Sequence, residues 1–258
     1  MTTNPYTAPA ATVADPAAPQ GKFIPGGRAV AAGRGWSWFV AAWSLFRKQP
    51  GVWIGIFVII ALFGILSTRI EFIGGLAITL LAPVFGAGIV IGSRALDQGD
   101  EIRIGHLFAG FRQRFGALIG VGALYLAASM VVVLIALLFA GGSVMALAQG
   151  GRGASEWGAV LASIALFLLL MMALSVPVLM AVWFAPALVA LHERGPLEAM
   201  KESFQACLKN AVPFLVYGVV GLVLAIVASI PFGLGWLLFG PVLIASVYTA
   251  YKDIYLEA

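Results

Sequence analysis

Charged residues are scarce in this chain. Asp, Glu, Lys and Arg make up 10% of its 258 residues, and 62% of the residues are hydrophobic. A soluble domain is about 25% charged and about 45–50% apolar, so a soluble globular fold is excluded and lipid is the expected environment. The net charge of +4 is spread between long neutral runs. It does not form the basic patch that nucleic-acid binding requires.

Cysteine is nearly absent as well. Cys207 is the single one, which excludes an intramolecular disulfide, a CxxC redox pair and a multi-cysteine zinc site. The sequence also lacks the GxSxG, HExxH, P-loop and dinucleotide-binding motifs in a fitting context. The densest polar stretch runs from Arg94 to His106, and its acids fit a turn followed by a helix start better than a metal or catalytic site. We therefore expect no catalytic residue, no metal site and no cofactor.

Long apolar runs without a charge begin at Gly51. A bilayer core about 30 Å thick is crossed by about 20 helical residues. The last run, 210–251, is twice that length and must fold back, which Pro231, Gly233 and Gly235 would allow. The sequence predicts an all-α polytopic membrane protein whose fourth span is tilted or broken near Pro177. Its six transmembrane helices are expected at about 51–68, 72–96, 115–140, 157–191, 211–230 and 235–252.

Lys and Arg are distributed unevenly between the loops. If both termini are cytoplasmic, only Arg69 and Arg152 of the 15 basic residues lie outside. Because positively charged loops stay in the cytoplasm, we expect a multi-pass protein of the bacterial inner membrane with the N- and C-termini inside. Residues 1–34 are rich in Ala, Pro, Thr and Gly and are predicted to be a disordered cytoplasmic tail. Residues 35–258 form the predicted integral membrane domain.

One unit occurs three times, at about 35–97, 98–194 and 195–255. A shift of 65 residues aligns FRKQPGVWIG with FRQRFGALIG, and a further shift of 96 places Phe108 on Phe204. Each unit is expected to contain a short interfacial helix, a transmembrane helix and a returning helix with a proline. Pro83, Pro186 and Pro241 are the expected kink positions. We expect the three units to pack about a pseudo-threefold axis.

Aromatic and aliphatic residues spaced by three and four positions precede each of the odd-numbered spans. This spacing is typical of an amphipathic helix that lies in the cytoplasmic interface, and basic residues lie nearby. The candidate lipid-contacting residues are Trp36, Phe39, Trp43, Phe46, Arg47, Lys48, Ile104, Phe108, Phe111, Arg112, Arg114, Met200, Phe204 and Lys209.

Pairs of glycines four residues apart occur in three of the predicted spans. Small residues at this spacing let two helices approach closely in lipid. We expect them to pack helices within one chain, and a contact between two copies of the chain remains the alternative. The pairs are Gly51 and Gly55, Gly88 and Gly92, and Gly116 and Gly120.

Three stretches resemble an uncharacterised family of proteobacterial six-span inner-membrane proteins: GRGWSWFVAAWSLFRKQPGVWI, LLAPVFGAGIVIGSRALDQGDEIRIGHLFAGFR and GPVLIASVYTAYKDIY. A fourth, FAPALVALHERGPLEAMKESFQACLKN, is more distantly similar to the membrane domain of glycerophosphodiester phosphodiesterases. The chain lacks the phosphodiesterase domain, so this similarity implies an association with phospholipid and not the enzyme activity.

The sequence favours a non-enzymatic protein that binds or organises phospholipid, or partner membrane proteins, at the cytoplasmic leaflet. The apolar runs contain no ionisable side chain of the kind that ion-coupled transporters use. The alternative is an uncoupled channel or facilitator for a small neutral or amphipathic molecule. Membrane phospholipid is the expected partner, a membrane protein or a second copy of the chain is the further alternative, and no nucleic-acid partner is expected.

Overall fold

The computed structural model describes residues 21–148 and 154–257. Residues 1–20, which form the first part of the predicted tail, and Arg152 lie outside the described residues. Within the described ranges, six segments are long and apolar enough to cross a membrane, as predicted. They are α2 (Pro50–Ser67), α3 (Glu71–Asp97), α5 (Phe115–Ala148), α6 (Ala154–Trp183) continued by α7 (Ala185–His192), α9 (Ala211–Ser229) and α10 (Trp236–Tyr255).

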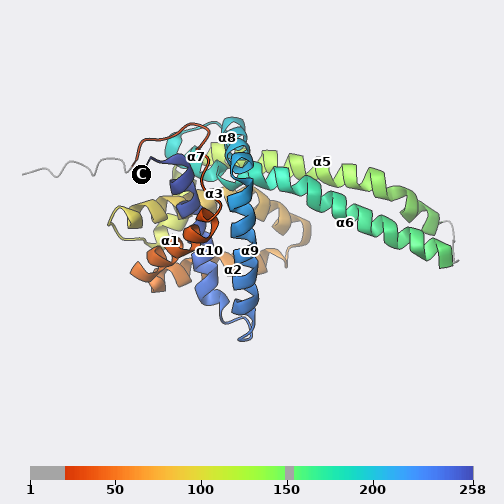
Figure 1. Cartoon of the computed structure of the whole chain (residues 1–258), viewed down its shortest axis with the longest axis horizontal. Coiled ribbons are helices and arrows are strands. Elements are labelled where there is room, and N and C mark those ends of the chain that lie inside the picture. Colours follow the sequence, from red (N-terminus) through yellow and green to blue (C-terminus); the bar gives the residue numbers. More distant parts are fainter. Residues whose placement is uncertain (1–20, 149–153, 258) are drawn as a thin grey trace, which may run out of the picture.

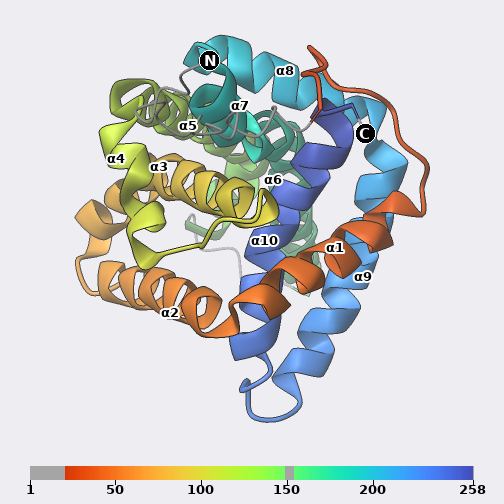
Figure 2. The same ribbon diagram turned by 90° about the vertical axis from the view of Figure 1, so that its left-hand side faces the viewer.

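The spanning helices form three hairpins, α2–α3, α5–α6 and α9–α10. The α5–α6 hairpin extends to the right in Figure 1 and the α9–α10 hairpin points downward, while Figure 2 shows the α2–α3 hairpin extending to the left. The α9–α10 turn lies where the sequence predicts it, and Phe232 and Gly233 adopt positive φ angles of 53° and 81° there. The hairpins diverge from the end of the molecule where α3, α7 and α10 finish.

A short helical segment precedes each hairpin. These segments are α1 (Arg34–Lys48), the pair η1 (Ile104–Phe108) and α4 (Ala109–Arg112), and α8 (Pro196–Lys209). Each packs on a hairpin other than the one that it precedes: α1 lies on α9 and α10 (Figure 2), η1 and α4 lie on α3, and α8 lies on α6. The three contacts therefore form a closed cycle around the molecule.

The middle segment is less regular than the predicted single helix. It consists of a five-residue 3₁₀ turn and a four-residue α-helix, and Arg114 has a positive φ of 57° before α5 begins. Gly110 in α4 lies directly on the backbone of Val84 in α3, where an added methyl group would overlap the Val84 carbonyl. This close approach fixes the short segment against α3.

Residues 21–33, the second part of the predicted tail, are bound to the helical body. We call them the N-terminal strap. The Ile24 N–H donates to the Tyr255 carbonyl at 2.8 Å, and the Val30 N–H donates to Oδ1 of the fully buried Asn210 at 2.8 Å. The composition of the strap predicts disorder, but backbone hydrogen bonds, which do not depend on apolar side chains, hold this stretch against the helices.

The fourth span is broken at Phe184, beside Pro186, whereas Pro177 lies inside α6. The prediction of a break near Pro177 is therefore wrong. Ser203 of α8 is inserted at the break, where its Oγ accepts a hydrogen bond from the Phe184 N–H at 2.9 Å and donates to the Met180 carbonyl at 2.7 Å. The serine hydroxyl takes the place of the hydrogen bond that an unbroken helix would form between these two backbone groups, so the break costs little free energy of folding. Pro83 and Pro241 lie inside the continuous helices α3 and α10.

The core surrounds α10. In this helix 67% of the most apolar window is buried by protein, compared with at most 33% in any other spanning segment of the described chain. Its neighbours include α1, α2, α3 and α9. The remaining apolar surface of the hairpins is exposed in the isolated chain, which suits side chains that contact lipid.

Candidate functional site

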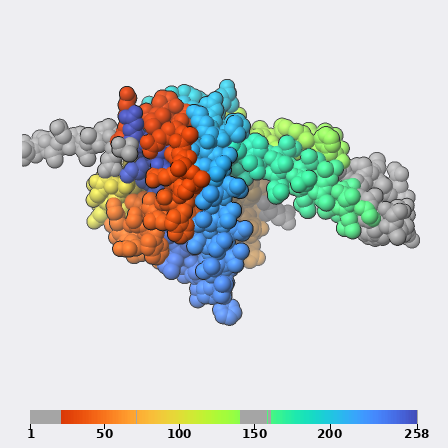
Figure 3. All heavy atoms as spheres, viewed as in Figure 1, coloured from red at the N-terminus to blue at the C-terminus, as the bar shows by residue number. Residues whose placement is uncertain are grey.

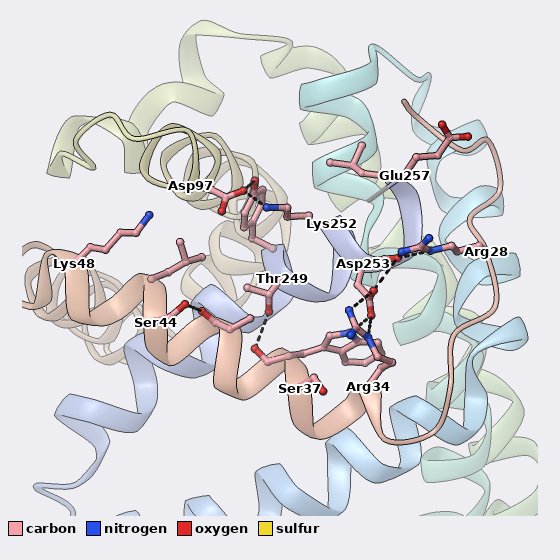
Figure 4. A pocket seen from close by; sticks show the side chains of 15 residues that line it. Arg28, Arg34, Ser37, Ser44, Lys48, Asp97, Thr249, Lys252, Asp253 and Glu257 are labelled. Carbon is pink, nitrogen blue, oxygen red and sulfur yellow. Dashed lines mark hydrogen bonds and ion pairs between the residues drawn. The ribbon is translucent and has the colours of Figure 1, made fainter. Parts of the chain in front are cut away.

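A polar pocket of about 290 Å³ lies between the strap, α1 and the last turns of α10 (Figure 4). We call it the junction pocket. The end of α3 contributes Asp97 to its wall, and α1 contributes Ser37 and Ser44 from one face. Its charged lining residues are Arg28, Arg34, Lys48, Asp97, Lys252, Asp253 and Glu257.

Asp253 is the centre of the first charge network in this pocket. Its carboxylate is 6% exposed and accepts two hydrogen bonds from Arg34, at 2.6 and 2.7 Å, and one from Trp38 Nε1 at 2.8 Å. Arg28 donates from Nε to the Asp253 carbonyl at 2.8 Å. The hydrogen bond to Asp253 raises the pKa of Arg34 above its usual value. A buried carboxylate is stable only with such complete compensation, and here it ties the strap and α1 to α10.

Asp97 forms the second network. Its Oδ2 accepts a hydrogen bond from Lys252 Nζ at 2.6 Å and one from the Tyr248 hydroxyl at 3.0 Å. Lys48 at the end of α1 donates to the Leu96 carbonyl at 3.0 Å. The two acids at the pocket centre are therefore neutralised by the protein itself. Within the described residues no group of acids, histidines or cysteines could hold a metal ion.

Another face of α1 borders an apolar groove of about 500 Å³. The groove runs from α1 along the α9–α10 hairpin toward the 230–235 turn. No charged side chain lines it, and its contrast with the junction pocket divides α1 into a polar face and a lipophilic face. The groove is lined by Trp36, Phe39, Val40, Trp43, Leu224, Val227, Ala228, Pro231, Gly235, Leu238, Phe239 and Val242.

The predicted lipid-contacting residues divide into two groups by burial. Phe39, Phe46 and Met200 are buried in the core, and Phe204 is half-buried. The apolar members that remain exposed are Trp36, Trp43, Ile104, Phe108 and Phe111. The exposed basic members are Arg47, Lys48, Arg112, Arg114 and Lys209.

Three of the basic side chains bind backbone carbonyls. Besides Lys48, Arg114 donates to the Glu193 carbonyl at 2.7 Å, and Lys209 donates to the Gly26 carbonyl at 3.0 Å. The Lys48 and Arg114 contacts each join segments of one unit, and the Lys209 contact joins α8 to the strap. Within the described residues, the exposed side chains of Arg47 and Arg112 form no hydrogen bond or ion pair.

The predicted glycine pairs also have different environments. A methyl group at Gly88 would overlap the His106 and Leu107 carbonyls of η1, and one at Gly120 would lie 2.9 Å from Pro196 Cγ. Gly92 faces the same turn of η1, at 3.0 Å from His106 Cβ. By contrast, a methyl group added at Gly51 or Gly116 would meet no neighbouring atom within 4 Å, and one added at Gly55 would make an ordinary contact at 3.6 Å. Close packing within the chain therefore involves Gly88, Gly92 and Gly120.

The most heavily bonded residues of the site are absent from the sequence-based candidates. Asp253 lies in the last apolar helix, and a single acid in such a helix is the signal that could have identified it. Trp38 is 1% exposed and packs on Phe214 and Tyr217 of α9. Its indole N–H points to Asp253, which no periodicity of apolar residues predicts.

The chain resembles a known protein along most of its length. A "probable inner membrane protein" of Burkholderia thailandensis is 31% identical over 217 residues, which cover 81% of this chain and 79% of that protein. No protein-family model matches the chain, and no solved structure matches it.

Proposed function

Because the chain belongs to the same family as the probable inner membrane protein of Burkholderia thailandensis, we propose that this multi-pass inner-membrane protein binds phospholipid at the cytoplasmic leaflet, with an acyl chain in the apolar groove. The observation that carries the proposal is the groove, which starts at the tryptophans of α1 and follows the α9–α10 hairpin.

The charge distribution supports the orientation. With both termini in the cytoplasm, α1 lies at the inner surface and the 230–235 turn lies toward the periplasm. An acyl chain would then run from α1 into the bilayer along the groove. Trp36 and Trp43 are large rings with a polar N–H, which suits the boundary between headgroups and acyl chains. Arg47 follows Trp43 by one helical turn and is exposed, so it can meet the lipid phosphate.

Selectivity in such a groove comes from shape and headgroup contacts. Apolar burial alone contributes little, because an acyl chain leaves surroundings that are equally apolar.

The closed cycle of α1, η1–α4 and α8 on neighbouring hairpins supports three structural units about a pseudo-threefold axis. The exposed Ile104, Phe108 and Phe111 give the second unit an apolar face at the same level. In this proposal α1, η1–α4 and α8 lie in the cytoplasmic interface and position the lipids.

The test is native mass spectrometry of the protein released from its own membrane in a mild detergent. Val227→Trp places a large ring in the groove, and Val223→Trp places the same ring one turn earlier on α9, outside the groove lining. Both valines are exposed, so neither change should prevent folding.

We expect the native chain and Val223→Trp to retain a defined number of one phospholipid class, and Val227→Trp to lose at least half of it. Trp43→Ser should weaken retention as well. Equal retention by the native chain and Val227→Trp would refute the groove as the binding site. Release of a small metabolite in place of lipid would favour a facilitator instead.

A further inference from the structure

Three returning helices end around a second cavity, of about 400 Å³. We call it the three-helix cavity. Arg94 and Gln98 come from the end of α3, His192 from the end of α7, and Tyr248 and Tyr251 from α10. The strap closes it with Gly21, Lys22 and Phe23, and the Phe23 ring stacks on His192 with centroids 3.7 Å apart. It lies where the three units meet.

The described lining of this cavity combines cationic and polar groups with the apolar side chains of Phe23, Leu191 and Leu256. Arg94 and Lys22 are its charged groups, and no carboxylate lines it. Two of the other polar groups are already engaged with each other, since the Tyr251 hydroxyl is hydrogen-bonded to His192 Nε2. Asp97, three residues after Arg94 in the sequence, is engaged by Lys252 and Tyr248.

Arg94 makes no side-chain hydrogen bond and no ion pair within the described part of the chain. A guanidinium carries five N–H donors and no acceptor, and one that is partly enclosed by protein needs partners for them. A cation at the end of a helix often serves to bind the last carbonyls of that helix. The Arg94 guanidinium makes no such bond within the described residues, so its N–H donors are open to another partner.

We propose that the three-helix cavity binds a phosphate-bearing anion, with Arg94 as the principal ligand and Lys22 and Gln98 as further donors. Planar N–H pairs of arginine match two phosphate oxygens. The phosphate can belong to a soluble phosphorylated molecule or to an anionic lipid headgroup at the inner surface. The cavity shares no lining residue with the apolar groove, so the two proposals can fail separately.

The experiment measures binding of inorganic phosphate to the full-length protein in phosphatidylcholine nanodiscs by isothermal titration calorimetry. Arg94→Gln should weaken binding about tenfold or more, because charge-assisted hydrogen bonds are lost. Lys22→Gln should weaken it a few-fold. Arg103→Gln removes the same charge from a 76% exposed side chain outside the cavity and should leave binding unchanged.

A second set of nanodiscs that contain phosphatidylglycerol identifies the source of the phosphate. If a lipid headgroup occupies the cavity, these nanodiscs abolish the binding of inorganic phosphate, and native mass spectra show phosphatidylglycerol retained by the native chain and lost from Arg94→Gln. If the ligand is soluble, binding of inorganic phosphate is the same in both nanodiscs.

The proposal is overturned if the native chain and Arg94→Gln bind inorganic phosphate equally. It is also overturned if the native chain binds none in phosphatidylcholine and retains no phosphatidylglycerol through Arg94. If Arg94→Gln does not fold, Lys22→Gln decides the question, because Lys22 is exposed on the strap and its loss leaves the helix packing intact. Unchanged phosphate binding and lipid retention in Lys22→Gln would then reject the site.

Discussion

The helices α6 and α10 are both apolar, proline-containing returning helices, yet they differ in how far the rest of the protein buries them. In α10, 67% of the apolar window is buried, whereas none of the window in the α6–α7 segment is buried. The packing partners of α10 include four other helices, while α6 packs mainly on α5 and α8 and extends with α5 away from the body (Figure 3).

The more buried helix, α10, is the less apolar of the two, and the difference between them lies in its small and polar residues. An apolar side chain gains little free energy when it moves from lipid into a protein interior, because both surroundings are apolar. Helices in membranes therefore associate through close packing and hydrogen bonds. In α10, Thr249 donates to the Trp38 carbonyl at 2.8 Å, and Ser246 is hydrogen-bonded to the Tyr217 hydroxyl at 2.7 Å. Asp253 adds its charge network. Polar anchors therefore determine which returning helix becomes central.

The largest expected effect comes from removing the main anchor of α10. Asp253→Ala leaves Arg34 and Trp38 without their acceptor at a buried position. We expect the free energy of unfolding to fall by about 3–5 kcal/mol, measured by equilibrium unfolding in mixed micelles. Glu198→Ala removes an exposed acid of α8 that pairs with Arg194 and should cost less than about 1 kcal/mol. Equal losses in the two variants would contradict the central role of α10.

The next effect concerns close backbone packing. Gly110→Ala places a methyl group on the Val84 carbonyl of α3, so we expect a loss of about 1–3 kcal/mol in the free energy of unfolding. Gly116→Ala is the matched control, because the added methyl group would meet no neighbouring atom within 4 Å. It should stabilise α5 by about 0.4–1 kcal/mol through a less flexible unfolded chain. The same unfolding assay compares them, and a loss of similar size in both would show that the contact with Val84 is not responsible.

A smaller effect is expected at the break in the fourth span. Ser203→Ala removes the bridge between the Phe184 N–H and the Met180 carbonyl and should cost about 1–2 kcal/mol. Ser44→Ala removes a hydroxyl that only bonds locally, to the Ala41 carbonyl on an exposed surface, and should change little. Hydrogen exchange provides a second measurement, since the Phe184 amide should lose protection in Ser203→Ala alone.

The sequence predicts the six spans well because length and apolarity are properties of each segment by itself. The turn at Pro231 to Gly235 was predictable for the same reason. The sequence names Pro186 as a kink position but also allows a break near Pro177, so it does not decide which proline interrupts the fourth span. What separates them is Ser203, which reaches the chain at Phe184 from a different helix.

The candidate site was harder to predict than the fold. Periodicity identifies the apolar face of α1 but not which of its residues are exposed. Phe39 and Phe46 are buried, although Phe39 also borders the groove, while Trp36 and Trp43 line the groove and are exposed. The strap and Asp253 are far apart in the sequence, and their pairing depends on the way α1 crosses α10. Interactions between distant segments leave no local pattern from which they could be inferred.

The smallest expected effect tests the other side of the comparison, the α6 helix. Leu169 lies in its apolar window and is 58% exposed in the isolated chain, so its side chain contacts lipid in the membrane. Replacing it with alanine exchanges protein–lipid contacts for lipid–lipid contacts, and the free energy of unfolding should change by less than about 0.5 kcal/mol. The unfolding assay in mixed micelles checks this, with Leu118→Ala of the fully buried α5 position as the control that must show a clear loss. A loss above about 1.5 kcal/mol for Leu169→Ala would mean that α6 packs against another protein surface in the membrane, because lipid alone does not distinguish the two side chains so strongly.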